Sequence, residues 1–94
     1  IVKKNNRRVL KLLDKFGELY YGELKKALKI DSTTLSMALN ELVDNKLIKR
    51  REEPEPSKRI PKVYYSLTSL GKEALEIYEL AEELERKREA EVKE

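Results

Sequence analysis

The chain has 94 residues, which is enough for one small domain and too few for two. It contains no Cys and no His, so disulfides, thiolate metal sites and imidazole acid–base chemistry are excluded, and we expect no metal, no cofactor and no enzymatic activity. The net charge is +3, 41% of the residues are charged, and no apolar run approaches the roughly 20 residues of a membrane span, so we expect a cytoplasmic protein without a membrane partner.

The first predicted helix lies in the segment NNRRVLKLLDKFG. Asn5 or Asn6 is expected to cap its start, and Gly17 is expected to end it. Apolar residues spaced i, i+3, i+4 and i+7 predict one buried stripe: Val9, Leu12, Leu13 and Phe16.

A second, shorter helix is predicted in the segment YGELKKALKI, after a brief extended link at Leu19 and Tyr20. Gly22 is the expected N-cap, and Glu23 lies in the first turn, where the helix dipole favours a negative charge. Three apolar residues are expected to face inward: Leu24, Ala27 and Leu28.

The third helix is predicted to begin after Asp31, a good N-cap, and to run to about Asn45. On a helical wheel one side is largely apolar: Leu35, Ala38, Leu39, Leu42, Val43 and Lys46. The other side is short, polar and free of basic residues: Thr33, Ser36, Met37, Asn40 and Asp44. An outward face without Lys or Arg is unusual in a chain that has 21 of them.

A hairpin is predicted next, with Leu47 and Ile48 in its first strand. The second strand alternates with a period of two in the segment VYYSLT. All three prolines lie between the strands, so we expect a long, semi-rigid loop.

The last predicted helix starts at a cap formed by Thr68 or Ser69 and runs to about residue 90. Its apolar residues are spaced 4, 3, 4, 3, which is typical of a coiled-coil seam: Leu70, Ala74, Ile77, Ala81 and Leu84. We therefore expect residues 1–68 to form the main domain and residues 69–94 to form a dimerisation helix that frays at its end.

Charge is segregated along the chain. Residues 1–62 hold 16 basic and 9 acidic side chains, a net charge of +7, whereas residues 63–94 hold 5 basic and 9 acidic side chains, a net charge of −4. A basic front and an acidic tail favour different partners for the two parts. The absence of Gln beside abundant Lys and Glu is also typical of a thermophile's composition.

Two motifs resemble one superfamily. The segment ELKKALKIDSTTLSMALNELVDNKLIKR is similar to the helix-turn-helix of MarR-, ArsR- and PadR-type transcriptional regulators, and KVYYSLTSLGKEAL is similar to the end of their wing and the start of their last helix. The resemblance covers about residues 9–78. It implies a mainly α protein with a small β-hairpin wing (α+β), that is, a winged helix-turn-helix with a long C-terminal helix.

The resemblance also implies a function and its residues. The protein would bind double-stranded DNA as a homodimeric, nucleoid-associated transcription regulator, with the helix at about 32–45 in the major groove and the wing at about 49–62 on the backbone or in the minor groove. Candidate base-reading residues are Ser32, Thr33, Thr34, Ser36, Met37 and Asn40. Candidate phosphate and wing contacts are Lys25, Lys26, Arg50, Arg51, Lys58, Arg59 and Lys62. These families commonly place a basic residue on the recognition face, and this chain departs from that at Met37 and its neighbours.

Two alternatives stay open at this point. A winged helix can serve only as a protein-interaction module of a larger assembly, in which case the acidic last helix would be the docking surface. It can also act as an architectural chromatin protein that binds DNA without sequence preference. The sequence identifies no small-molecule effector and no operator.

Overall fold

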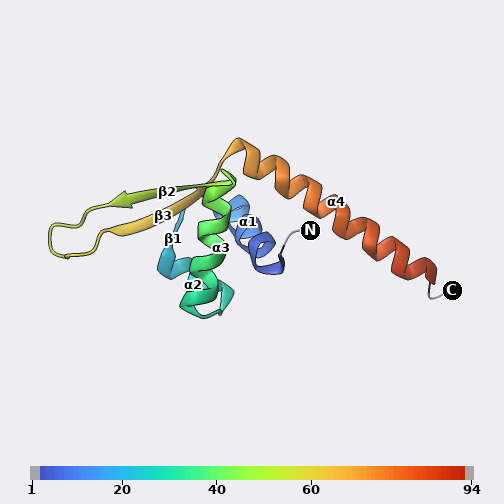
Figure 1. The fold of residues 1–94 in the computed structure, drawn as a ribbon, viewed down its shortest axis with the longest axis horizontal. Helices are drawn as coiled ribbons and strands as arrows, with labels where there is room; N and C mark the ends of the chain where they lie inside the picture. Colours follow the sequence, from blue (N-terminus) through green and yellow to red (C-terminus); the bar gives the residue numbers. More distant parts are fainter. Residues whose placement is uncertain (1–2, 93–94) are drawn as a thin grey trace.

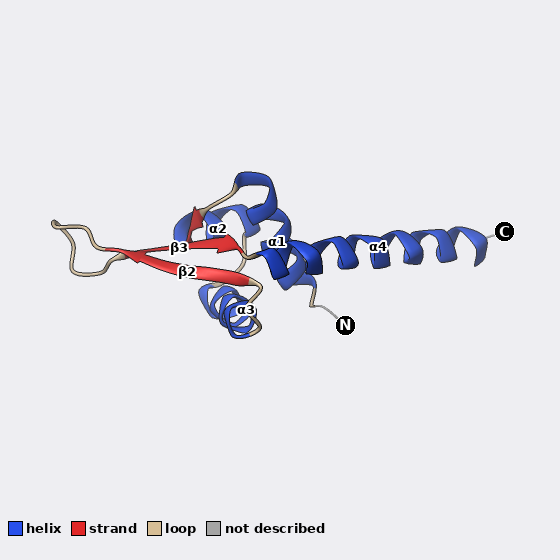
Figure 2. Cartoon of the chain, turned by 90° about the horizontal axis from the view of Figure 1, so that it is seen from above, coloured by secondary structure: helices blue, strands red, loops and turns tan. Residues whose placement is uncertain are grey.

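The computed structural model describes residues 3–92, which form four helices and a small sheet (Figure 1). In chain order the elements are α1 (Lys4–Phe16), β1 (Leu19–Tyr20), α2 (Tyr21–Leu28), α3 (Ser32–Asp44), β2 (Ile48–Glu53), β3 (Lys62–Leu67) and α4 (Ser69–Val92). The strands form an antiparallel sheet in the order β1-β3-β2. The β2–β3 hairpin and α4 leave the helical body at opposite ends, as Figure 2 shows from above, and the molecule is 61 Å long.

The core lies where α1, α2 and α3 meet the sheet. Most of its side chains are Leu, and burying one of them stabilises the fold by about 1.5–3 kcal/mol. The buried apolar residues of the cluster are Val9, Leu10, Leu13, Leu24, Leu28, Leu35, Leu39, Leu42, Ile48, Tyr65 and Leu75. Leu35, Leu39 and Leu42 confirm most of the predicted inward face of the third helix, whereas Lys46, expected on that side, is exposed and lies beyond the end of the helix. In β3 only Tyr65 is buried and the other five residues are half-buried, so the structure shows the predicted alternation at Tyr65 alone.

Helix α1 differs from the prediction at its start and at its last turn. The expected cap at Asn5 or Asn6 is wrong, because both residues lie inside the helix, Asn6 is buried and the N-cap is Lys3. Phe16 was expected in the buried stripe but is 58% exposed, and Leu10 takes its place in the core. The predicted stop is confirmed: Gly17 has a φ of 81°, and its N–H donates to the carbonyl of Leu13 at 2.8 Å.

Helices α2 and α3 form the predicted helix-turn-helix. Gly22 is not the N-cap of α2, because the helix begins at Tyr21 and the side chain of Glu23 accepts the backbone N–H of Tyr20 at 3.0 Å. Ala27 is exposed rather than inward, since the buried stripe of α2 consists of Leu24 and Leu28 alone. In the turn, Lys29 adopts a left-handed conformation with a φ of 55°.

The hairpin pairs over six residues on each strand, from Ile48 opposite Leu67 to Glu53 opposite Lys62. Strand β1 pairs only with Tyr64 and Tyr65 of β3. Within residues 3–92, the part of the hairpin beyond Tyr64 therefore has no third strand beside it. Leu47, predicted in the strand, lies in the turn before it.

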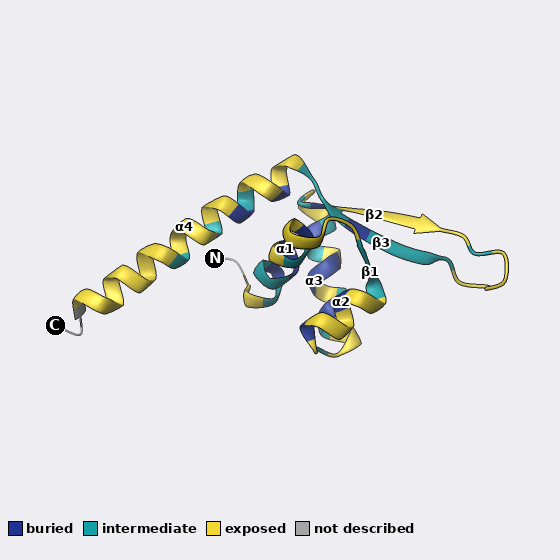
Figure 3. Ribbon diagram, turned by 180° about the vertical axis from the view of Figure 1, so that it is seen from behind, coloured by how far each residue is buried: buried dark blue, intermediate teal, exposed yellow. Residues whose placement is uncertain are grey.

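Helix α4 begins as predicted and then leaves the body. The Thr68 hydroxyl accepts the N–H of Gly71 at 2.9 Å and donates to the carbonyl of Lys46 at 2.7 Å, which fixes the start of the helix to the turn before β2. Leu75 is buried in the core, while the following turns are largely exposed (Figure 3). The first turns of α4 thus pack against α1 and β3, and the division of the chain at residue 68 stays a prediction.

Candidate nucleic-acid interface

The outward face of α3 is exposed and carries no cation. Met37 is 63% exposed, and Thr33 and Asn40 are exposed beside it. The opposite side of the helix is buried at Leu35 and Leu39. A helix with short side chains on its open face can approach the base edges of a major groove closely.

Two of the predicted base-reading residues already have hydrogen-bond partners. The Thr34 hydroxyl donates to the Asp31 carboxylate at 2.5 Å, and this bond, with the Thr34 backbone N–H, holds the pKa of Asp31 below its ordinary value. Ser36 is half-buried, and its hydroxyl lies 3.3 Å from that of Tyr21, which also donates to the Ser32 carbonyl at 3.2 Å. The side chains left open on this face are therefore those of Ser32, Thr33, Met37 and Asn40.

Tyr21 is a residue of this surface that the sequence did not single out. Its hydroxyl joins the first turn of α2 to the first turns of α3. No sequence pattern predicts this contact, because the two hydroxyls belong to residues 15 positions apart on different helices.

The cations of α2 are open. Lys25 and Lys26 are exposed, and neither forms an ion pair with another residue of the range 3–92. Lys29, in the turn to α3, is a third exposed cation and was not among the predicted phosphate contacts. These ammonium groups are free to meet phosphates.

The arginines at the base of the wing are paired with carboxylates. Arg50 lies 2.7 Å from Glu52. Arg51 forms ion pairs with Glu18 at 2.8 Å and with Glu53 at 2.9 Å, and the hydrogen bonds to these carboxylates raise the pKa of Arg51. Arg50 and Arg51, two of the predicted phosphate contacts, thus already form ion pairs with neighbouring carboxylates.

The far end of the wing has one cation without a partner among the described residues. Lys58 and Lys62 both reach Glu55, at 3.6 and 3.8 Å, whereas Arg59 forms no ion pair with any residue of that part of the chain. Next to it, Ile60 is 78% exposed, which no sequence pattern had indicated.

The predicted seam of α4 has no partner within residues 3–92. Leu70, Ile77 and Leu84 are between 51% and 64% exposed, and Leu80, outside the predicted seam, is equally open. The two alanines of the seam are half-buried or exposed: Ala74 and Ala81. A row of exposed apolar residues on a long helix favours association with another surface.

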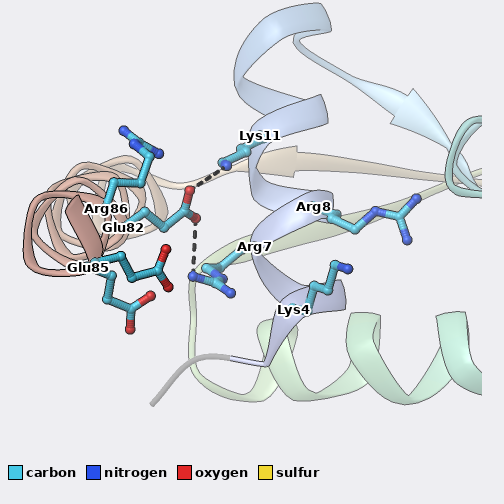
Figure 4. A pocket seen from close by; sticks show the side chains of 8 residues that line it. Lys4, Arg7, Arg8, Lys11, Glu82, Glu85 and Arg86 are labelled. Carbon is cyan, nitrogen blue, oxygen red and sulfur yellow. Dashed lines mark hydrogen bonds and ion pairs between the residues drawn. The ribbon is translucent and has the colours of Figure 1, made fainter. Parts of the chain in front are cut away.

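One side of α4 is held to α1 by ion pairs (Figure 4). The Glu82 carboxylate lies 3.2 Å from Arg7 and 3.1 Å from Lys11. The hydrogen bond from Lys11 is the main reason that the pKa of Glu82 lies below its ordinary value. The basic face of α1 and the acidic face of α4 thus meet within one chain.

None of the helices in the range 3–92 combines the length and apolar character that a bilayer crossing demands. The same range contains no cluster of three or more carboxylates arranged around a possible metal ion.

The chain was compared with protein families and curated proteins. The model of the family described as the TFIIE alpha subunit matches residues 1–92. An uncharacterized HTH-type transcriptional regulator from Methanocaldococcus jannaschii is 40% identical over 89 residues, which are 95% of this chain and 81% of that protein. A second, uncharacterized protein from the same organism is 40% identical over 83 residues, 88% of this chain and 68% of its own length.

The fold was compared with solved structures. A PadR family transcription regulator from Clostridium difficile superposes with a TM-score of 0.80 at 26% identity, over 90% of this chain and 93% of that chain. A MarR variant from E. coli complexed with operator DNA superposes with a TM-score of 0.66 at 27% identity, over 80% of this chain. This chain spans about half of that MarR chain, 51%.

These findings confirm the winged-helix fold and the resemblance to MarR- and PadR-type regulators. The family and the neighbours are transcription factors and regulators, not enzymes. The chain therefore belongs to the TFIIE alpha subunit family and has the winged-helix fold of transcription regulators.

Proposed function

We propose that this chain binds double-stranded DNA sequence-specifically, as a homodimer, with α3 in the major groove and the wing on the backbone or in the minor groove. The observation that carries the proposal is the exposed face of α3, which is polar and free of Lys and Arg, in a chain with a transcription regulator's fold. Base edges are read by hydrogen bonds and apolar contacts, which short polar side chains and Met37 can supply.

Charge around α3 supports the same proposal. Phosphate contacts position a protein on the duplex, and they require cations beside the reading helix. Lys25 and Lys26 on α2 and Arg59 on the wing are free of ion pairs among residues 3–92. Specific contacts would then come from α3, and most of the affinity from these flanking cations.

The exposed seam of α4 supports the dimer. If two copies pair along α4, their recognition helices can meet successive major grooves about 34–36 Å apart, on a roughly palindromic site. The regulator named MarR, which has this fold, was solved with operator DNA. We place the protein with the nucleoid in the cytoplasm on the same grounds.

Selection of bound sequences from a random duplex pool tests binding, specificity and two-fold symmetry together. The proposal predicts an enriched motif with two inverted half-sites separated by about one helical turn. Recovery of DNA without any enriched motif would instead support an architectural protein that binds all sequences alike. A motif without two-fold symmetry would contradict the dimer but not the role of α3 in base recognition.

A second candidate function is a protein-interaction module, which is favoured by the description of the family as a subunit. In that case the acidic α4 would dock on a partner protein, and the chain would retain little random duplex even at low salt. The two functions are separated by a titration with random duplex at low ionic strength, because a DNA-binding protein retains non-specific affinity there.

A further inference from the structure

The far half of the wing needs a support that the sheet does not provide. Beyond Tyr64 the hairpin consists of two strands only, and an isolated two-stranded hairpin is marginally stable in water. The wing nevertheless has to point in one direction if its cations are to meet a DNA backbone. Contacts that join the hairpin to the body can supply this support.

Arg51 makes such contacts from the face of the sheet that lies away from the helices. Side chains alternate between the faces of a strand, and Ile48 and Tyr65 point into the core. Arg50, opposite Tyr65, shares that core side. Arg51 and its cross-strand partner Tyr64 therefore lie on the other side of the sheet.

The contacts of Arg51 reach across the whole sheet. Its Nε and Nη2 donate to the two carboxylate oxygens of Glu18 at 3.2 and 2.8 Å, a bidentate pair that joins β2 to the segment before β1. Its guanidinium carbon lies 4.6 Å from the centre of the Tyr64 ring on β3. A bidentate, stacked arginine restricts direction as well as distance, because the guanidinium is planar.

Two further contacts continue this network toward the loop. The Tyr64 ring meets the ring of Tyr20 edge to face, with centroids 6.0 Å apart. The Lys62 ammonium lies 4.4 Å from the centre of the Tyr20 ring. Residues of all three strands, and the segment before them, are thus held together on one face.

We propose that Arg51 is a positioning residue, which with Glu18 and Tyr64 fixes the direction of the wing relative to the helical body, and that it is not a phosphate contact. We call these three residues the wing clamp. The idea rests on the proposed DNA binding for its functional effect, although the restriction of the hairpin itself does not depend on DNA.

The change Glu18→Gln gives opposite results for the two roles of Arg51. If Arg51 contacted phosphate, removing the charge of Glu18, one of its two acidic partners, would tighten DNA binding, since only Glu53 would still compete. The wing clamp predicts weaker binding, by roughly threefold to tenfold, because the wing loses its direction. Glu52→Gln is the matched control: it removes the acidic partner of Arg50 without breaking a contact to the segment before β1, and it should not weaken binding. Tighter binding by Glu18→Gln would overturn the wing clamp.

Arg51→Lys keeps the charge and removes the planar fork. The wing clamp predicts that Arg51→Lys and Glu18→Gln lose similar affinity and that the double variant loses little more, since both break one unit. It also predicts an unchanged slope of log Kd against log salt. If Arg51 contacted phosphate, Arg51→Lys would instead keep most of the DNA affinity. A slope smaller by about 0.9 in Arg51→Met would also support that role and overturn the wing clamp.

A measurement without DNA separates a failure of the wing clamp from a failure of the proposed function. The chain has no Cys, so Ser57→Cys on the wing and Asp44→Cys at the end of α3 accept two spin labels cleanly. Pulsed electron–electron double resonance should give a narrow distribution of distances between the two labels in the otherwise unchanged chain and a broader distribution after Glu18→Gln. Equal widths would overturn the wing clamp whatever the result with DNA, while a broadened wing in a chain that binds no duplex would refute only the proposed function.

Discussion

At the scale of single residues, the exposed face of α3 has few side chains that can read a base. Asn40 is exposed, and an amide can pair with adenine through two hydrogen bonds. Met37 beside it offers an apolar surface that suits a thymine methyl group. Asn40 is therefore the side chain of this face best suited to distinguish one base from another.

Asn40→Ala should relax the preference at one base position of the selected site, with a loss of about 1–3 kcal/mol of discrimination there. Binding to a set of duplexes, each changed at one position, measures the effect. Arg59→Ala is the control, because a cation that contacts phosphate should weaken binding to every duplex alike. Equal losses on specific and random duplexes for Asn40→Ala would remove it as a base reader.

Gly71 is required by close packing. A Cβ added to it would lie 1.9 Å from the carbonyl oxygen of Leu47, a backbone atom that cannot turn aside. We expect Gly71→Ala to lower the free energy of unfolding by at least about 2 kcal/mol, measured by urea denaturation. Gly22→Ala is the matched change, since its Cβ would meet only the end of the Tyr20 ring. Similar stability of the two variants would show that the start of α4 can move away from Leu47.

At the scale of elements, α4 would connect the helical body to the second copy of the proposed dimer. Its apolar seam is exposed on one side, and Glu82 on another side holds it to α1. The direction of α4 would therefore set the separation between the two recognition helices of a dimer.

Ile77→Glu should separate the dimer, because a carboxylate buried in an apolar seam is strongly unfavourable. Sedimentation equilibrium should then give the mass of one chain, and affinity for the selected duplex should fall. Glu76→Gln, the neighbouring exposed position, should leave the mass unchanged. If Ile77→Glu sediments like the unchanged chain, α4 is not the dimer interface.

The ion pairs of Glu82 should make stability depend on acid. The pKa of Glu82 lies below its ordinary value of 4.5, mainly because Lys11 donates to the carboxylate, so the folded state binds its proton less readily than the unfolded state does. The stabilisation is therefore present above about pH 4.5 and is lost as pH falls through the lowered pKa. Unfolding measured against pH should show that Glu82→Gln costs stability at neutral pH and nothing in strong acid. A difference independent of pH would contradict this role.

Much of the fold could be predicted from local patterns of the sequence. The predictions that failed did so where contacts in the folded chain override a local preference. The 3.6-residue period predicted α1 and α3, the 4, 3, 4, 3 spacing predicted α4, and alternation predicted β3. The predicted N-cap of α1 was wrong because Asn6 is buried and Asn5 accepts a hydrogen bond from Arg8. A residue's preference for the N-cap position does not include such contacts.

The candidate site divides in the same way. The open face of α3 follows from its own helical period, so it could be predicted. The partners of Ser36 and Arg51 could not, because Tyr21 and Glu18 lie 15 and 33 positions away along the chain. Base-reading and phosphate roles thus remain predictions, and the contacts that restrict those side chains required the fold.

At the scale of the whole molecule, basic and acidic residues lie in different parts of the structure. The net charge of +7 on residues 1–62 belongs to the helical body and the wing, while the acidic part is mostly α4, which extends to the other end of the molecule (Figure 1). Such separation would orient an approaching duplex toward the body and away from α4. The proposed dimer would then present two basic bodies, joined by an acidic centre, to one side of the DNA.

The dependence of binding on salt tests this account most directly. If each protomer neutralises about four phosphates, the slope of log binding constant against log salt should be near −7, from about −0.9 per phosphate. Fluorescence anisotropy with the selected duplex, over roughly 50 to 200 mM salt, measures it. A slope near −7 is the expected result, whereas a slope shallower than about −2 would contradict the claim that cations around α3 contact the phosphates of the DNA backbone.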